Sequence, residues 1–329
     1  MKKGLSLFIG ILLVILAAGY GISAKSRPGD VRVLKLAHSL NTQHPVHKTI
    51  EYMARLVKEK SDGRLIIQIF PGEQLGGEKE CIEALQLGYL GMTKISSAVM
   101  ESFVPKMRVF GLPYLFRDSE HFWKVATGPV GKELLEAGGS KGLKGLCYYD
   151  AGARSFYSKK EINSPADLRG MKIRVMKSIM LMEMVKTMGG SPTPMTWGEL
   201  YTSLEQGVVD AAENNPPSFE TSRHYEVCRY YTLDEHVRVP DVLVISNRVW
   251  ENLSPEFQGI LQEAVDESVT YNRRLWKEAE EESLEKVKAA GVKIIRPDKK
   301  PFQESVRPML ELYRDSDLGG LIDEIQRIE

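Results

Sequence analysis

Apolar and polar positions along the chain predict strands and helices in alternation. Residues 31–38 fit a strand, and apolar residues at helical spacing predict a helix from Pro45 to about Ser61. A second strand is expected at residues 64–70 and a second helix at residues 78–87. Because strands that alternate with helices are typical of layered α/β folds, we expect a largely parallel sheet.

The same alternation returns after Gly142. Strands are expected at residues 143–149 and 172–176, and helices that end at glycine are expected at residues 178–190 and 197–207. A chain of 329 residues is longer than one hydrophobic core usually supports. We therefore predict two α/β lobes.

One long helix is predicted near the C-terminus. Ser254 suits the N-cap, Pro255 suits the first helical position, and Gly291 suits the position that ends a helix. About 36 residues would span roughly 54 Å, whereas a small domain is about 30 Å across. An unbroken helix must therefore contact both lobes, and the alternative is two shorter helices that meet near Tyr271.

The N-terminus has the order of regions found in secretory signals. Lys2 and Lys3 precede an apolar run from Leu5 to Ala18, and small residues follow up to Ala24. We predict a signal peptide at residues 1–24 with cleavage near Ala24. An uncleaved anchor is the alternative, because residues 19–22 extend the apolar run.

Charge and cysteine content exclude several classes of protein. The chain has 44 basic and 44 acidic residues, so it has no bulk attraction for nucleic acid. Cys81, Cys147 and Cys228 form no CxxC pair, so we predict buried free thiols rather than a disulfide framework or a zinc site.

Motifs for catalysis are missing. The sequence has no GxSxG, P-loop or GxGxxG motif, and clustered carboxylates occur only where the long helix is expected to face solvent. His44 and His47 form an HxxH without further ligands at suitable spacing, so we predict surface histidines and no metal site. No cofactor and no enzyme activity are expected.

Side chains that donate hydrogen bonds occur instead in or next to the predicted strands. Arg154 follows one predicted strand, Arg174 lies within another, and Asn214 and Asn215 fall in a loop after a third. Arg174 alternates with apolar residues, as Lys172 does, so a solvent-facing position is the simplest interpretation. Two guanidinium groups and an amide at one cleft would, however, suit a carboxylate ligand.

Longer strings make the chain recognisable. It resembles the solute-binding subunits of tripartite ATP-independent periplasmic (TRAP) transporters, the dicarboxylate-binding-like (DctP-like) family, over nearly all of the mature chain. The strings that carry the resemblance are GARSFYS, NSPADLRGMKIRV, GGSPTPMTWGELYTSLEQGVVDAAEN, HYEV, LSPEFQ, GRLIIQIFPGEQLGGEKE and FGLPYLF.

The resemblance implies a two-lobed α/β fold like that of periplasmic binding proteins. A ligand cleft would lie between the lobes, and the long helix would span both. The implied segments are lobe 1 at 25–150 with a returning segment at about 240–254, lobe 2 at 151–239, the long helix at 254–291, and a C-terminal segment at 292–329 that packs on the lobes.

The resemblance also implies a site and partners. Arg174 would pair with the carboxylate of a small organic acid, Arg154 and Asn214 match the family's second arginine and its asparagine, and Trp197 would pack on the ligand or in the core. The protein would act in the periplasm and deliver its ligand to TRAP membrane subunits. In the other lobe Glu78, His38 and Ser39 lie at loop positions that can face the cleft, although surface or capping roles are equally open. Lys94, Ser96 and Ser97 are further candidates for the same wall.

Ligand identity is predicted from the polar loops. The ENNPPS string and the polar loop side chains that can bond to hydroxyl groups are similar to those in the branch of the family that binds sugar acids such as hexuronates. A C4-dicarboxylate would require a second strong cation, against which Glu78 argues. Other classes also stay open: a ligand-sensing subunit for a membrane kinase, and a secreted enzyme on acidic sugars, which the missing acid–base pair disfavours.

Overall fold

The computed structural model describes residues 31–329, and Arg32–Glu329 form one compact unit. The predicted signal peptide at residues 1–24 lies outside the described residues. No helix within residues 31–329 is long and apolar enough to cross a membrane.

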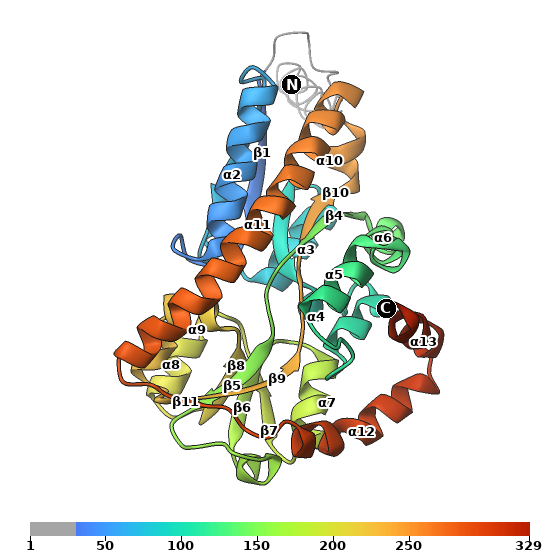
Figure 1. Cartoon of the computed structure of the whole chain (residues 1–329). Helices are drawn as coiled ribbons and strands as arrows, with labels where there is room; N and C mark the ends of the chain where they lie inside the picture. The colour runs from blue at the N-terminus through green and yellow to red at the C-terminus, as the bar shows by residue number, and fades with distance from the viewer. Residues whose placement is uncertain (1–30) are drawn as a thin grey trace, which may run out of the picture. The chain divides into compact units, whose positions relative to one another are not determined.

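Two β-sheets organise the unit (Figure 1). The first sheet has five strands in the order β2-β1-β3-β10-β4, and the second has six in the order β11-β9-β5-β8-β6-β7. The strands of the first sheet are β1 (Arg32–Ala37), β2 (Leu65–Phe70), β3 (Met92–Ser96), β4 (Leu143–Tyr149) and β10 (Asp241–Ser246). Those of the second are β5 (Arg154–Ser158), β6 (Lys172–Val175), β7 (Ser191–Pro194), β8 (Ala211–Asn214), β9 (Tyr230–Val237) and β11 (Lys293–Ile295).

Helices pack on both sheets, and the lobe around each sheet is called here the first or the second lobe. The helices are α2 (Pro45–Lys60), α3 (Glu78–Leu87), α4 (Ser97–Met100), α5 (Ser119–Thr127), α6 (Pro129–Glu136), α7 (Ile179–Thr187), α8 (Leu200–Glu205), α9 (Pro216–Thr221), α10 (Asn247–Glu251), α11 (Pro255–Ala289), α12 (Lys300–Arg314) and α13 (Gly319–Arg327). Helix α2 buries Val46, Ile50, Met53 and Val57, as its apolar spacing predicts.

The prediction of a largely parallel sheet is confirmed, although among the described strands each sheet contains one that runs against the others, β10 in the first sheet and β5 in the second. β10 runs antiparallel to β3 and β4, and β5 runs antiparallel to β8 and β9. The reason is that the chain passes directly from a strand of one sheet into a strand of the other at two places, from β4 into β5 and back from β9 into β10, before α11 leads from the first sheet to β11 in the second. The outgoing and returning strands lie side by side, so they must run in opposite directions.

The long helix is confirmed as one unbroken element, α11. Ser254 caps it by accepting a hydrogen bond from the backbone N–H of Phe257, and Gly291 follows it with a φ of +91°. α11 contacts α2 in the first lobe and α9 in the second, and it appears in orange beside both in Figure 1. The helix therefore ties the two lobes together.

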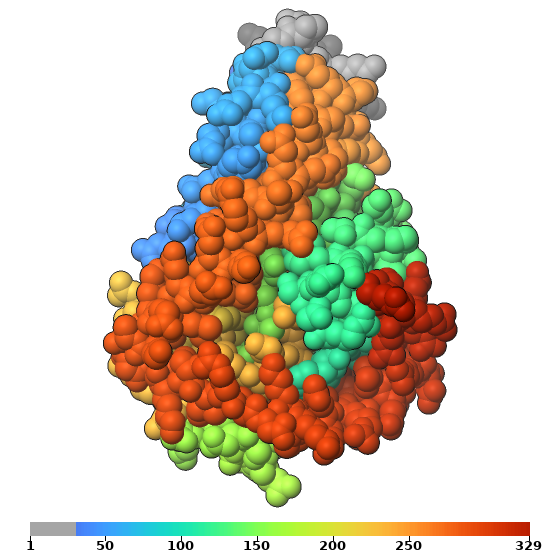
Figure 2. Space-filling view, viewed as in Figure 1, coloured from blue at the N-terminus to red at the C-terminus, as the bar shows by residue number. Residues whose placement is uncertain are grey.

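The surface is hollowed over the segments where the chain crosses from one sheet to the other. Figure 2 shows this hollow between α11 and the segment that contains α5. It is lined by Trp123, Asp150, Arg273, Lys277 and Glu280, among others. The backbone N–H of Asp150, which follows β4, donates to Asn272 Oδ1 of α11 at 2.6 Å. α11 is thus bonded directly to the first crossing segment.

The three cysteines Cys81, Cys147 and Cys228 are buried and free, which confirms the prediction for them.

Gly152 lies between β4 and β5, where the chain first crosses to the second sheet, and it provides a test of how this crossing segment packs on α11. Its φ is +57°, and a Cβ atom there would lie 2.2 Å from Glu280 Oε1 and 2.9 Å from Trp276 Nε1. We predict that Gly152→Ala lowers the free energy of unfolding by at least about 1–3 kcal/mol, the usual cost of a left-handed conformation in a residue with a side chain. Urea unfolding followed by circular dichroism would measure the change.

Gly259 is the matched control. It lies inside α11, and a Cβ atom there would meet nothing within 4 Å. Gly259→Ala should raise the free energy of unfolding by about 0.5–1 kcal/mol. Equal effects of the two substitutions would contradict this account of the crossing segment.

Candidate ligand-binding site

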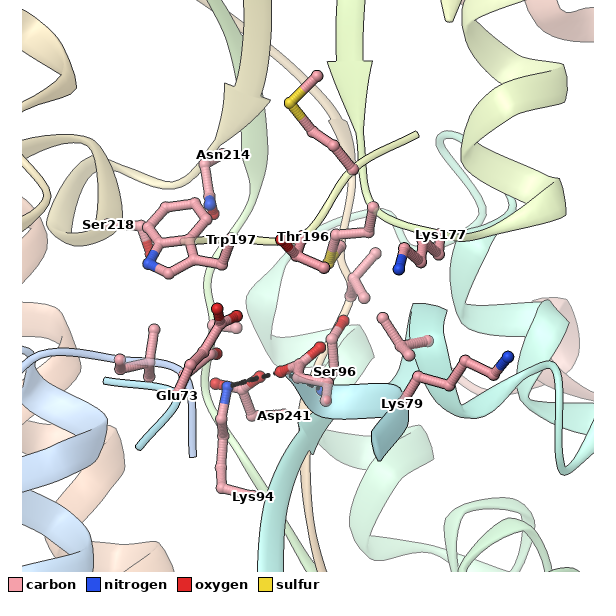
Figure 3. Close-up of a pocket in the computed structure, with 18 of the residues that line it drawn as sticks. Glu73, Lys79, Lys94, Ser96, Lys177, Thr196, Trp197, Asn214, Ser218 and Asp241 are labelled. Atoms are coloured by element: carbon pink, nitrogen blue, oxygen red, sulfur yellow. Dashed lines mark hydrogen bonds and ion pairs between the residues drawn. The ribbon is translucent and has the colours of Figure 1, made fainter. Parts of the chain in front are cut away.

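A pocket of about 710 Å³, including the part open to solvent, lies between the two lobes (Figure 3). The first lobe contributes Ser39, His44, Glu73, Glu78, Lys94, Ser96 and Asp241, among others. The second contributes Arg154, Arg174, Met195, Trp197, Asn214, Asn215 and Ser218, among others.

Contacts across the pocket join the lobes. Asn41 Nδ2 donates to the carbonyl oxygen of Thr221 at 2.8 Å, and His44 Nε2 lies 3.1 Å from Ser218 Oγ. The backbone N–H of Gly198 donates to Glu73 Oε2 at 3.2 Å. The structure therefore shows the lobes in contact around the pocket.

Arg174 lies in the wall of the pocket rather than in bulk solvent. It is 2% exposed, whereas Lys172 on the same strand is exposed. Its Nε and Nη2 donate to the carbonyl oxygen of Met195 at 3.2 and 2.9 Å. Its Nη1 is buried, and no partner for it exists within residues 31–329. Burial lowers the pKa of Arg174, but a guanidinium remains charged at neutral pH.

Trp197 covers the guanidinium of Arg174, which lies 5.7 Å from the centre of its ring. Trp197 is half-buried, packs against the core of the second lobe and also lines the pocket. Behind it lies His224, at a ring distance of 5.0 Å. Burial, aided by the charge of Arg174, lowers the pKa of His224 to about 3. The imidazole is thus neutral and does not compete with Arg174 for an anion.

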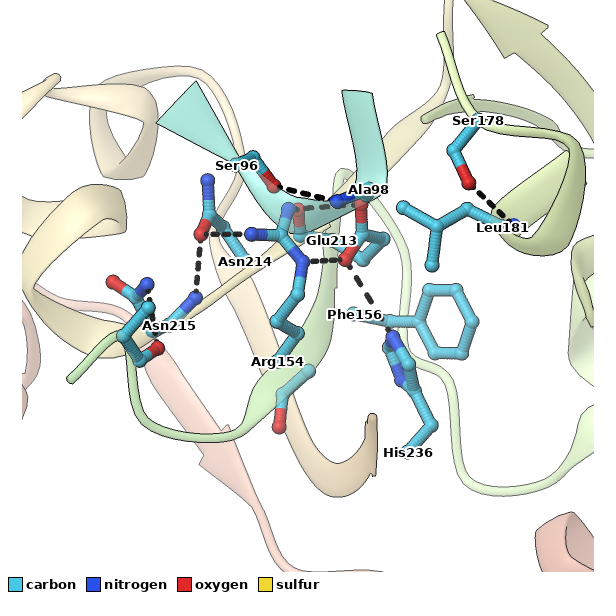
Figure 4. Close-up of polar contacts among 12 residues, drawn as sticks. Ser96, Ala98, Arg154, Phe156, Ser178, Leu181, Glu213, Asn214, Asn215 and His236 are labelled. Atoms are coloured by element: carbon cyan, nitrogen blue, oxygen red, sulfur yellow. Dashed lines mark hydrogen bonds and ion pairs between the residues drawn. The ribbon is translucent and has the colours of Figure 1, made fainter. Parts of the chain in front are cut away.

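Arg154 also borders the pocket, but its donors are mostly in use (Figure 4). Its Nε and Nη2 donate to the carboxylate of Glu213, and its Nη1 donates to Asn214 Oδ1 at 2.9 Å. Burial opposes ionisation of Glu213, but Arg154 lowers the pKa of this carboxyl group to about 2. The expected pair of free guanidinium groups is therefore reduced to one, Arg174.

The ion pair between Arg154 and Glu213 continues into the interior of the second lobe. His236 Nδ1 lies 2.7 Å from Asp234 Oδ2, and His236 Nε2 lies 3.6 Å from Glu213 Oε2 (Figure 4). Burial opposes protonation of His236, yet Asp234 and Glu213 raise its pKa to about 9. Close polar contacts thus link Asp234, His236, Glu213 and Arg154 in one buried series, of which Arg154 is the member that lines the pocket.

The two asparagines are not in a loop as predicted. Asn214 is the last residue of β8, because the strand continues beyond the VVDAA string. Asn215 is the N-cap of α9, where its Oδ1 accepts from the backbone N–H of Ser218 at 2.8 Å. Asn215 Nδ2 donates to the carbonyl oxygen of Ala151 at 2.9 Å. Asn215 therefore borders the pocket mainly as a structural residue.

The wall from the first lobe is built around a buried lysine. Lys94 is 2% exposed, and its Nζ lies 3.0 Å from Asp241 Oδ1 and 3.3 Å from Glu78 Oε1. The backbone N–H of Ser96 donates to the same Glu78 oxygen at 3.1 Å. Glu78 lines the pocket, as predicted, but as a partner of Lys94.

His38 does not line the pocket, although Ser39 does. Its Nε2 lies 3.0 Å from His47 Nδ1, and its Nδ1 accepts from the backbone N–H of Leu40 at 3.1 Å. Burial lowers the pKa of His38 to about 3. His38 is therefore a neutral core residue.

The prediction of surface histidines at His44 and His47 was also wrong. The two side chains are 2% and 3% exposed. His44 caps α2 by accepting from the backbone N–H of Val46, and His47 bonds to His38. Because histidines with such partners satisfy their polar atoms, they can be buried. No group of three or more potential metal-ligating side chains occurs in the described part of the chain.

Sequence analysis missed Asp241 and Glu73 as wall residues. Asp241 opens the apolar strand β10, and a single carboxylate at the start of a buried strand was a usable signal. Glu73 lies in a loop at a φ of +60°, and no simple pattern marks it. The completed pocket has a cationic end at Arg174 and an acidic end on the first lobe.

Comparison with known proteins agrees with this geometry. The family model described as "Bacterial extracellular solute-binding protein, family 7" matches residues 36–316. The protein YiiZ of Salmonella typhimurium is 43% identical over 89% of this chain and 91% of its own length.

Solved structures resemble the chain throughout. A TRAP periplasmic solute-binding protein from Xanthobacter autotrophicus, with bound β-D-galacturonate, is 40% identical, has a TM-score of 0.87, and matches over 90% of this chain and 100% of its own. One from Pseudomonas putida, with bound D-glucuronate, is 35% identical with a TM-score of 0.87, over 90% of this chain and 97% of its own. From the family match and these likenesses we conclude that the chain belongs to the bacterial extracellular solute-binding proteins of family 7 and is a solute-binding subunit of a TRAP transporter.

Proposed function

We propose that this protein captures a sugar acid outside the cytoplasm and delivers it to TRAP membrane subunits, and that this sugar acid is a hexuronate. One observation carries the proposal: Arg174 is buried at the pocket with Nη1 unpaired among the described residues. A buried cation with a free donor favours an anionic ligand, and a carboxylate fits the planar guanidinium.

Binding energy would come from several contacts together. A hydrogen bond to a charged group contributes about 1.5–3 kcal/mol, whereas micromolar affinity requires about 8 kcal/mol. Trp197 offers an aromatic surface beside the guanidinium, and Asn214, Ser39 and Ser218 offer further polar groups in the same pocket. Arg174 thus fixes the acid group, and the other side chains add the rest of the affinity.

Hexuronates are favoured over C4-dicarboxylates for two reasons. The similar structures from Xanthobacter and Pseudomonas hold galacturonate and glucuronate. In addition, Lys94, the buried cation of the first lobe, is already bonded to two carboxylates of this chain. The second free cation that a dicarboxylate requires is therefore missing from the buried walls within residues 31–329.

Capture would proceed by closure of the lobes about the crossing segments. We place the lobe boundaries near residues 150 and 240, where the chain passes from one sheet to the other. The contacts of Asn41, His44 and Glu73 with the second lobe support a closed form that excludes water from the ligand.

Substitution of Arg174 tests the proposal. Arg174→Ala should abolish detectable binding of galacturonate and glucuronate in calorimetry, because the carboxylate loses its only free buried guanidinium. The thermal transition of the ligand-free variant should stay nearly unchanged, because the loss of the bonds to Met195 is offset by removal of a buried charge. Lys172→Ala, on the exposed side of the same strand, should bind like the wild type, and full affinity in Arg174→Ala would refute the proposal.

Delivery to the membrane subunits requires export, which the N-terminus is proposed to direct. We predict that expression of the full chain in a bacterium gives a periplasmic protein whose first residue is at or near Lys25, by cleavage after Ala24. Intact mass and N-terminal sequencing of the periplasmic fraction would measure this. Recovery of the uncleaved chain in the membrane fraction would favour the anchor instead.

A further inference from the structure

The wall that the first lobe presents to the pocket carries more negative than positive charge. Glu73, Glu78 and Asp241 contribute three carboxylates, and Lys94 is the buried cation among them. Lys79 and Lys177 also border the pocket, but both are exposed, and Figure 3 shows them at one edge, away from Lys94 and Asp241. Glu73 reaches across to the backbone N–H of Gly198 in the second lobe, so the acidic groups around Lys94, on the wall that faces the lobe of Arg174, are Glu78 and Asp241.

Lys94 has little capacity left for a ligand anion. An ammonium group has three donors, and two of them reach Asp241 Oδ1 and Glu78 Oε1. Burial opposes its charge, but the two carboxylates outweigh burial and raise the pKa of Lys94 above its ordinary value. Lys94 thus acts as a permanent clamp that holds the two carboxylates in place.

Each clamped carboxylate keeps one oxygen without a donor. Lys94 and the Ser96 amide contact Oε1 of Glu78, and Lys94 contacts Oδ1 of Asp241. Within the part of the chain that the structure describes, no side chain or amide donates to Glu78 Oε2 or Asp241 Oδ2, and neither atom is among the fully buried unpaired ones. Both residues line the pocket, so these oxygens can accept hydrogen bonds from a ligand.

We infer that Asp241 and Glu78, clamped by Lys94, accept hydroxyl groups from the far end of the ligand and thereby restrict the pocket to acids with a single carboxylate. The inference rests on the proposed function, because it takes the carboxylate of the ligand to lie at Arg174. It names the ligand class more narrowly: a hydroxylated monocarboxylate is accepted, and an aldarate or other dicarboxylate is rejected.

The physical reason is the difference between a hydroxyl group and a carboxylate at that end. A hydroxyl donates to a carboxylate oxygen in a charge-assisted hydrogen bond. A second carboxylate has no hydrogen to donate, and it would lie against Asp241 and Glu78 with only one shared cation between them. Like charges in such positions are strongly unfavourable in a buried site.

The experiment compares galacturonate with galactarate, in which the aldehyde carbon of the same sugar is oxidised to a second carboxylate. Calorimetry on the mature protein should give at least about 100-fold weaker binding of galactarate. Asp241→Asn should weaken galacturonate binding by about 10-fold or more, because Oδ2 or its replacement no longer carries the charge. The same change should leave galactarate binding unchanged or stronger, so the ratio of the two affinities falls.

Two further variants make the test robust. Glu78→Gln alters the other acceptor and should lower the same ratio, even if Asp241→Asn folds poorly. Glu83→Gln removes one negative charge from an exposed residue of α3 that does not line the pocket, and it should leave the ratio as in the wild type. A thermal transition of each ligand-free variant would establish that it is folded.

The outcomes separate this inference from the proposed function. If the wild type binds galacturonate and galactarate equally, and Arg174→Ala loses both, the inference is overturned and the proposed function stands. The same holds if Asp241→Asn and Glu78→Gln both keep the wild-type ratio. If the wild type binds no hexuronate, the proposed function itself fails.

Discussion

A buried guanidinium with an unused donor is the constraint on which the pocket depends. Taking such a charge out of water is expensive, and the carbonyl oxygen of Met195 offsets only part of the cost. The neighbouring side chains do not offset the rest of this desolvation cost, because the carboxylate of Glu213 is already paired with Arg154 and His224 is neutral. The wall of the second lobe therefore keeps one unused donor of a buried charge, which an anion would occupy under the proposed function.

The wall of the pocket on each lobe is built from segments far apart in the sequence, because the chain passes from β4 into β5 and returns from β9 into β10. Lys94 and Asp241 are 147 residues apart in the sequence, yet they meet because β10 returns to the first sheet beside β3. Arg154 and Arg174 come from β5 and β6, which both border β8 in the second sheet. One wall thus holds the unpaired donor of Arg174, the other holds carboxylate acceptors, and each is rigid because it is built on strands.

Local patterns predicted what depends on near neighbours along the chain. The caps and length of α11, the buried face of α2 and the helix at α3 follow from residue spacing, and each was correct. The family resemblance pointed to Arg174, and its position in a loop pointed to Glu78; both residues line the pocket. What failed depends on partners far away in the sequence: the charge of Arg154 is paired with Glu213 from another strand, and the buried His38 is bonded to His47. No spacing rule reports such pairings.

The three thiols have a consequence for how the chain matures. Burial raises the pKa of Cys81 to about 11 and that of Cys228 to about 12, and it raises the pKa of Cys147 as well. Because the thiolate is the species that oxidises, these groups are inert in the folded state even in an oxidising compartment. The fold of residues 31–329 therefore forms without a disulfide, and its stability does not depend on one.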